Sequence, residues 1–263
     1  MNKNKIRSIK TAAKGYAFIG INLIGVLIFW TIPLIFSFII SISKWDYSKG
    51  IKGIKLTGLS NYIEMWKDEW FRASLINNII FTISFVLILV VLSFVVAYVL
   101  NEYVVGKKLV QLGLYLPYIV NIVAISAVWL ALFSNNGPVI SFLKKVGIEN
   151  PPVFIADLHW ALPTIVLICV WQNLGYTVIL FLSGMVNIPK DLYEAAAIDG
   201  ANGLQKIRYV TIPMLSGTTF FIVITSIINS FKVFGLINLM THGGPGTSTT
   251  MLVYNIYRTA FQY

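Results

Sequence analysis

Charged residues are scarce in this chain. They make up 11% of its 263 residues, and ten of them are acidic, whereas soluble domains carry about 25% charged residues. Hydrophobic residues account for 57%, and the mean hydropathy is +0.78. The composition therefore excludes an ordinary soluble domain and indicates an integral membrane protein.

Residues suited to catalysis or metal binding are also few. The single cysteine, Cys169, excludes an intrachain disulfide. The histidines His159 and His242 lack the partners that a metal site or a Ser/His/Asp triad requires. The phosphate-binding pattern G-x-x-x-x-G-K-[ST] is missing, because Gly106-Lys107-Lys108 has neither the upstream glycine nor the hydroxyl residue. We expect no enzymatic activity, no metal site and no cofactor in this chain.

The net charge of +10 is spread over the loops. No basic cluster is interleaved with aromatic residues, so the charge does not indicate binding to nucleic acid. Contact with anionic lipid is the simpler explanation.

Long uncharged stretches are what the sequence does contain. Each exceeds the roughly 20 residues needed to cross a hydrocarbon core, and none alternates as the strands of a porin-type barrel do. The first follows a basic segment but is too long for the core of a signal peptide, so we expect an uncleaved span. These stretches cover residues 15–43, 73–101, 109–143, 158–189 and 209–231.

The predicted fold is therefore all-α, a polytopic transmembrane helical bundle. A cytoplasmic segment at 1–16 precedes a transmembrane domain at 17–263, and Pro33 predicts a kink in the first span. Residues 44–58 and 241–250 are expected to be a polar loop and a flexible polar turn. The five predicted spans are 17–43, 77–100, 109–133, 160–184 and 213–240.

The segment 190–213, between the last two spans, is the most informative part of the chain. A short helix rich in alanine ends at Gly200, where a glycine lets the chain turn, and Pro213 stands where a first helical turn tolerates proline. Such a helix has few large apolar groups of its own, so it provides a surface for another protein. Its acidic and alanine residues are Asp191, Glu194, Ala195, Ala196, Ala197 and Asp199.

The spacing in this segment resembles the EAA loop of the membrane subunits of binding-protein-dependent ABC importers. That pattern runs Glu-Ala-Ala, three residues, Gly, nine residues, Ile, one residue and Leu-Pro. The matching positions here are Glu194-Ala195-Ala196, Gly200, Val210 and Ile212-Pro213. The resemblance implies that Glu194, Ala195, Ala196, Asp199 and Gly200 couple this chain to a cytoplasmic ATPase, and that ATP and Mg are bound by that partner.

Similarity to the carbohydrate-importer permeases extends over nearly the whole chain. It includes GLSNY at 58–62, LYLPYIVNIVAISAVW in the third span and LMTHGGPGTST at 239–249. The resemblance is to the type related to the larger maltose-permease subunit. Relatives usually have one more span after this point, and we expect that span to be missing here because the chain is cut short.

Polar residues inside spans are candidate substrate contacts, because leaving them in lipid is costly. Beside Trp171, span four offers an amide and a phenol, which suit stacking on and hydrogen bonding to a sugar, but an amide can equally join two helices. The resemblance places one pocket wall in span four and a second in span five. The substrate-binding residues that it implies are Gln172, Asn173, Tyr176, Ser226, Asn229 and Ser230.

Three further residues in spans have weaker claims. Asn121 and Trp129 in span three are interpreted mainly as packing residues. Lys232 is the one basic residue within a predicted span, and it either extends to the membrane surface or faces the substrate path.

Orientation does not follow from charge alone. With the N-terminus inside, the inner loops 1–14, 102–108 and 186–208 carry five, two and three basic residues, but the outer segment 44–72 is basic too. The resemblance resolves this, because an EAA loop faces a cytoplasmic ATPase. We therefore expect a multi-pass protein of a bacterial cell membrane with a cytoplasmic N-terminus.

The predicted function is that of a permease subunit of an ATP-driven carbohydrate importer. Its predicted partners are a second permease subunit, an ABC ATPase dimer, an extracellular sugar-binding protein, an oligosaccharide or other sugar, and the lipid bilayer. The alternative is a secondary transporter of a small polar solute driven by an ion gradient. Such a transporter needs a carboxylate inside the membrane, and none of the ten acidic residues lies in a predicted span.

Overall fold

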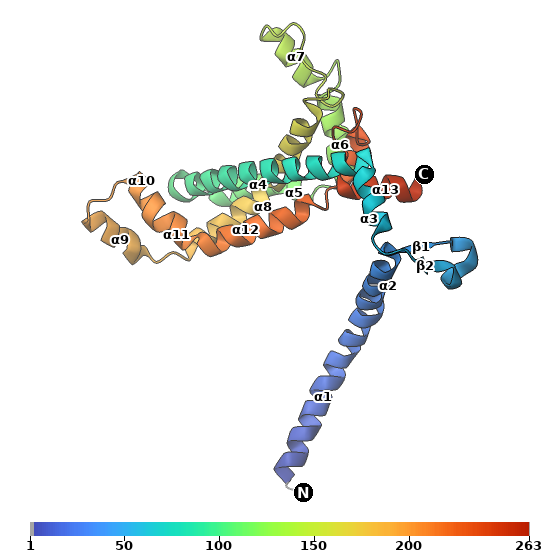
Figure 1. Ribbon diagram of the computed structural model, residues 1–263. Coiled ribbons are helices and arrows are strands. Elements are labelled where there is room, and N and C mark those ends of the chain that lie inside the picture. Colours follow the sequence, from blue (N-terminus) through green and yellow to red (C-terminus); the bar gives the residue numbers. More distant parts are fainter. Residues whose placement is uncertain (1–2, 263) are drawn as a thin grey trace. The chain divides into compact units, whose positions relative to one another are not determined.

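The computed structural model describes residues 3–262, which form two compact units, one up to Asp68 and one from Glu69 (Figure 1). Residues 1, 2 and 263, at the ends of the predicted segments, lie outside the described residues. Helix α1 runs without a break from Lys3 to Val26 and so crosses the predicted boundary at residue 16.

The first unit begins with one long apolar helix. After α1, a π-helical turn at Leu27–Thr31 leads into α2 at Ile32–Ser41. Proline has no N–H to donate, and a π turn is one way for a helix to accommodate this. The irregularity predicted at Pro33 is therefore a π turn that ends two residues before it. Gly15–Ser41 is long and apolar enough to cross a membrane, and its large side chains are exposed.

A short β-hairpin replaces the loop expected after this helix. Strands β1 (Ser43–Trp45) and β2 (Ile54–Leu56) pair antiparallel, with Ser43 opposite Leu56. A 3₁₀ segment at Tyr47–Gly53 joins them, and Asp46 accepts a hydrogen bond from the Ser48 amide at its start. The Ser48 hydroxyl and then Lys49 lower the pKa of the Asp46 carboxyl. Helix α3 (Ser60–Lys67) closes the unit.

The second unit is built around three long helices that pack side by side. These are α4 (Glu69–Tyr103), α8 (Ala161–Val186) and α12 (Ser216–Ser230) (Figure 1). The connecting helices are α5 (Lys107–Ile119), α6 (Ile122–Leu132), α7 (Pro138–Lys145), α9 (Lys190–Ile198), α10 (Gly203–Lys206), α11 (Ile212–Met214) and α13 (Leu252–Phe261). Further π turns lie at Ile207–Thr211 and Ile237–Thr241.

Figure 1 shows α9 and α10 beyond one end of the three-helix bundle, while α6, α7 and α13 lie toward the other end. Two buried apolar clusters fill the bundle. One joins α4 and α8 to Met251 and Tyr254 near the α13 end. The other includes Phe181, Leu215 and Ile222 near the α9 end.

Two of the predicted spans are bent in the structure. The third is split into α5 and α6, which meet at an angle of 97°. Pro117 lies inside α5, where it removes a backbone donor, and the Asn121 side chain accepts from the Val123 amide to begin α6. The fifth is bent by 65° between Gly203–Met214 and α12. Within residues 3–262, three helices are long and apolar enough to cross a membrane, or up to five if each bent pair forms one span.

The fifth span is also shorter than predicted. Helix α12 ends at Ser230, and Lys232 lies in the turn that follows it, so the prediction of Lys232 within a helical span was wrong. Phe231 and Lys232 form a turn, and the chain becomes helical again at Gly235. In this turn the lysine is able to reach the surface. Its side chain is exposed.

The turn at 241–250 is hydrogen-bonded, whereas the sequence led us to expect a flexible one. The Asn77 amide donates to the carbonyl oxygens of Thr247 (2.7 Å) and Thr250 (3.1 Å), and the Thr250 hydroxyl donates to Gly243 (2.9 Å). Thr249 and Thr250 are fully buried. Small polar residues here satisfy the backbone of the loop itself, which composition alone does not reveal.

Close packing of α5 against α8 yields a stability prediction. A Cβ added at Gly175 would lie 1.9 Å from the Leu114 carbonyl oxygen, whereas one at Gly113 meets nothing within 4 Å. Forcing extra atoms into such a contact costs about 1–3 kcal/mol. Gly175→Ala should therefore lower the melting temperature of the purified protein, and Gly113→Ala should not. Equal melting temperatures for the two variants would show that α5 and α8 are not this close.

Candidate functional site

The middle of α8 places the three predicted contacts of span four on a half-buried surface. Gln172, Asn173 and Tyr176 are each partly exposed. The Asn173 side-chain amide donates to the Cys169 carbonyl oxygen of its own helix at 2.8 Å, which leaves its side-chain oxygen and its second N–H for another partner. The surface is thus polar and aromatic within an otherwise apolar helix.

Tyr176 does not stand alone, because its ring stacks on Tyr118 of α5. The ring centroids are 4.7 Å apart and the planes differ by 9°, and Tyr115 lies next in the row with its centroid 5.5 Å from that of Tyr118. Gly175 permits the close approach of α5 that this stacking requires. Sequence reasoning missed Tyr118, although its place directly after Pro117, at the bend, was a signal for an exposed ring.

In α12 the three predicted contacts differ in accessibility. Asn229 is exposed, whereas Ser226 is 8% exposed and Ser230 is fully buried. The Ser230 hydroxyl lies 2.8 Å from that of Thr82 on α4, so in this conformation Ser230 joins two helices. The expectation that the α8 and α12 residues face one cavity stays a prediction.

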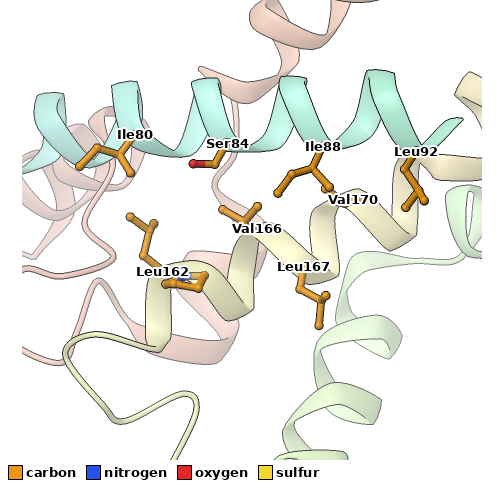
Figure 2. Close-up of a pocket in the computed structure, with 9 residues that line it drawn as sticks. Ile80, Ser84, Ile88, Leu92, Leu162, Val166, Leu167 and Val170 are labelled. Carbon is orange, nitrogen blue, oxygen red and sulfur yellow. The ribbon is translucent and has the colours of Figure 1, made fainter. Parts of the chain in front are cut away.

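The groove between α4 and α8 is apolar. It measures about 330 Å³, and Figure 2 shows Ile80, Ser84, Ile88 and Leu92 in one row along α4, facing Val166 and Val170 of α8. Ser84 is the one hydroxyl among its lining residues. A sugar needs several hydrogen-bonding groups, so this groove does not suit one.

A second cavity, of about 440 Å³, lies where α4, α5 and α8 meet near α9. Six of its nine lining residues are polar, although most of its surface is apolar. None of the predicted substrate contacts lines it. Gln172, Tyr176, Ile179 and Ser183 nevertheless recur at spacings of four, three and four, so they share one face of α8. Ile179 and Ser183 line the cavity. Its other polar lining residues are Asn101, Lys107, Lys108, Gln111 and Asn187.

The predicted coupling residues lie on and just after α9. Glu194, Ala195 and Asp199 are exposed, and Ala196 is half-buried. Asp199 is the C-terminal cap, and the helix ends in a Schellman motif: the Gly200 amide donates to Ala197 (3.1 Å) and the Ala201 amide to Ala196 (2.9 Å). Gly200 has φ +78°, so the predicted glycine turn is present.

Apolar side chains near these acids are left uncovered within the chain. Ile198 is 87% exposed and Leu204 is 75% exposed. A capping box between Asn202 and Gln205 fixes the start of α10 beside them. Exposed apolar groups next to acidic ones are typical of a surface that another protein covers.

The comparison with protein families decides what kind of protein carries this arrangement. Residues 90–263 match the family of binding-protein-dependent transport system inner membrane components. The chain belongs to this family. The predicted permease class and the helical membrane fold are thus confirmed, and the alternative of an ion-driven transporter is not supported.

Similar proteins cover nearly the whole chain. The probable ABC transporter permease protein YesP of Bacillus subtilis (strain 168) is 33% identical over 98% of this chain and 84% of its own length. The lactose transport system permease protein LacF of Rhizobium radiobacter is 30% identical over 95% of this chain and 84% of its own. The sn-glycerol-3-phosphate permease protein UgpA of Yersinia pestis is 33% identical over 79% of this chain and 70% of its own.

A solved structure shares the fold. The bacterial ABC transporter that imports the acidic polysaccharide alginate superposes with a TM-score of 0.82 and 24% identity over 99% of this chain and 88% of that chain. A second structure of a bacterial alginate transporter is a complex with a periplasmic protein bound to an alginate pentasaccharide. Family membership confirms the predicted kinds of partner protein and an inner-membrane location for this chain.

The end of α9 allows a direct test of the coupling prediction. A β-branched residue is strained at the φ of Gly200, by about 1–2 kcal/mol, whereas asparagine visits this region. Gly200→Val should uncouple ATP hydrolysis from uptake while the protein still inserts into the membrane. Gly200→Asn, the matched control, should keep both activities. Normal uptake by the valine variant would remove the coupling role from this turn.

Proposed function

We propose that this chain forms half of the path for a sugar or oligosaccharide in an ATP-driven importer, and that α9 couples this path to the ATPase. The observation that carries the proposal is the polar face of α8. It runs from the Tyr176–Tyr118 stack past Ile179 and Ser183 to a cavity at the end of the bundle where α9 lies, and six of the nine residues that line this cavity are polar. A substrate on this face would thus lie in line with the coupling helix.

The chemistry of this face favours a sugar. Aromatic rings stack on the apolar faces of sugar rings, while the amides of Gln172 and Asn173 are able to pair with hydroxyls. Relatives named for sugar substrates support the same class, since LacF is a lactose permease protein and the alginate transporter carries a polysaccharide. Asn229, Ser226 and Ser230 provide the second wall, and a substrate reaches Ser230 once its bond with Thr82 opens.

The orientation follows from the same proposal. With α9 on the cytoplasmic side, the 102–108 turn is cytoplasmic as well, because Asn101 and Lys107 line the cavity together with Asn187, just before α9. Residues 44–72 and 134–157 then lie outside, and the N-terminus inside. No catalytic role is part of this function, since the energy comes from the ATPase partner.

The decisive experiment is a measurement of ATP hydrolysis by the purified complex. The tagged chain should co-purify with a second permease and an ATPase, and sugar-loaded binding protein should stimulate hydrolysis. A chain that purifies without an ATPase would contradict the proposal. So would a complex whose ATP hydrolysis is not stimulated by sugar-loaded binding protein.

The polar face of α8 predicts that substitutions of Tyr176 lower sugar affinity by different amounts. Tyr176→Ala removes both a stacking surface and a hydroxyl, worth about 1–3 kcal/mol or roughly 5- to 150-fold in affinity. Tyr176→Phe keeps the ring on Tyr118 and should lose about 2- to 12-fold. Sugar uptake measured across concentrations checks both. Normal uptake by the alanine variant would make Tyr176 a packing residue.

The orientation predicts a labelling pattern. Ser48, Asn136 and Lys107 are exposed, and the native Cys169 is buried, so background labelling should be low. Cysteines introduced at positions 48 and 136 should react with an impermeant thiol reagent added outside intact cells, and one at position 107 should not. The reverse pattern would overturn both the orientation and the coupling role of α9.

A further inference from the structure

Helix α9 is attached to the rest of its unit through one side chain in particular. Most of its side chains are exposed, but Tyr193 is half-buried and packs against the apolar cluster that contains Phe181, Leu215 and Ile222. Its hydroxyl oxygen lies 3.0 Å from the hydroxyl oxygen of Thr211. This hydrogen bond joins two residues that are 18 positions apart in the sequence.

Thr211 occupies a defined position at the base of the α11–α12 segment. It is 1% exposed, and it is the last residue of the π turn Ile207–Thr211, two residues before Pro213. Its hydroxyl donates to the Lys206 carbonyl oxygen at 3.4 Å, which leaves the Tyr193 hydroxyl to donate to Thr211. The buried Thr211 hydroxyl thus accepts one hydrogen bond and donates another. Removing the Tyr193 hydroxyl would leave Thr211 without the donor.

The segment beyond Thr211 is packed directly on α8. Leu215 is 1% exposed, and the Leu215 amide donates to the Thr211 carbonyl oxygen at 3.0 Å. A Cβ added at Gly184 of α8 would lie 2.7 Å from the Leu215 side chain. Movement of Thr211 would therefore shift the start of α12 relative to α8.

We propose that the Tyr193–Thr211 hydrogen bond makes α9 and the base of α12 one mechanical unit, so that displacement of α9 moves the wall carrying Ser226 and Asn229. This rests on the proposed function and assigns Tyr193 and Thr211 as positioning residues. The covalent route from α9 to α12 is the backbone through Gly200, whose turn is able to absorb a displacement because glycine has the freest backbone. The hydrogen bond bypasses that turn.

The test compares variants that keep or remove the hydroxyl at position 211. Thr211→Val is nearly isosteric and loses the bond, whereas Thr211→Ser keeps a hydroxyl. The readout is the number of ATP molecules hydrolysed per sugar imported by the complex in proteoliposomes. We expect this ratio to rise about 2- to 12-fold in Thr211→Val, from the usual range for one neutral hydrogen bond, and to stay near the unmodified value in Thr211→Ser.

Tyr193→Phe should raise the ratio by a similar factor, and the double variant Tyr193→Phe/Thr211→Val by no more than either single change, since both changes remove the same Tyr193–Thr211 bond. Tyr103→Phe, a loss of hydroxyl from a tyrosine that is 74% exposed, serves as the control and should have no effect. An unchanged ratio in Thr211→Val, or fully additive effects, would overturn this inference while leaving the proposed function intact. Failure of the unmodified complex to couple ATP to uptake would overturn both.

Discussion

Backbone groups inside a lipid bilayer have no water to pair with, so a chain that bends there must satisfy its own N–H and C=O groups. This constraint determines where the second unit departs from straight helices. The break between α5 and α6 falls after Pro117, and Asn121 supplies the missing acceptor from its side chain. The π turn at Ile207–Thr211 precedes Pro213 and keeps the chain helical through a residue that has no N–H to donate.

Each of these breaks lies next to a part of the candidate site. The bend after Pro117 leaves Tyr118 stacked on Tyr176, at the centre of the proposed sugar face. The π turn brings Thr211 within hydrogen-bonding distance of Tyr193 on α9, the proposed coupling helix. Helical irregularities are common at functional sites because they redirect side chains without exposing the backbone. The proposed substrate path and its contact with α9 both depend on helix breaks whose backbone groups remain hydrogen-bonded.

Much of the fold was accessible from the sequence. Long uncharged stretches located α4 and α8 well, because a membrane helix must be apolar along its whole length. The offsets of Gly200 and Pro213 identified α9 and its end, since a φ of +78° selects glycine. The family assignment rested on the same residues, and the match over residues 90–263 confirms it.

Other features depend on contacts that periodicity does not encode. The 97° bend, the β-hairpin at 43–56 and the hydrogen-bonded loop at 241–250 arise from specific side-chain to backbone bonds, such as those of Asn121 and Asn77. The family resemblance implied that Ser230 meets a substrate, and in this conformation its hydroxyl pairs with Thr82. Burial of a hydroxyl against another helix is a tertiary property, so a single sequence does not distinguish it from a substrate contact.

The central claim is that ATP hydrolysed by a partner, and not an ion gradient, drives a sugar along the α8 face. The most direct measurement is uptake of a labelled sugar into proteoliposomes that contain the complete complex and its loaded binding protein. We expect uptake when ATP is present on the side of α9, with no change when ionophores dissipate ion gradients. Uptake driven by an imposed ion gradient without ATP would contradict it.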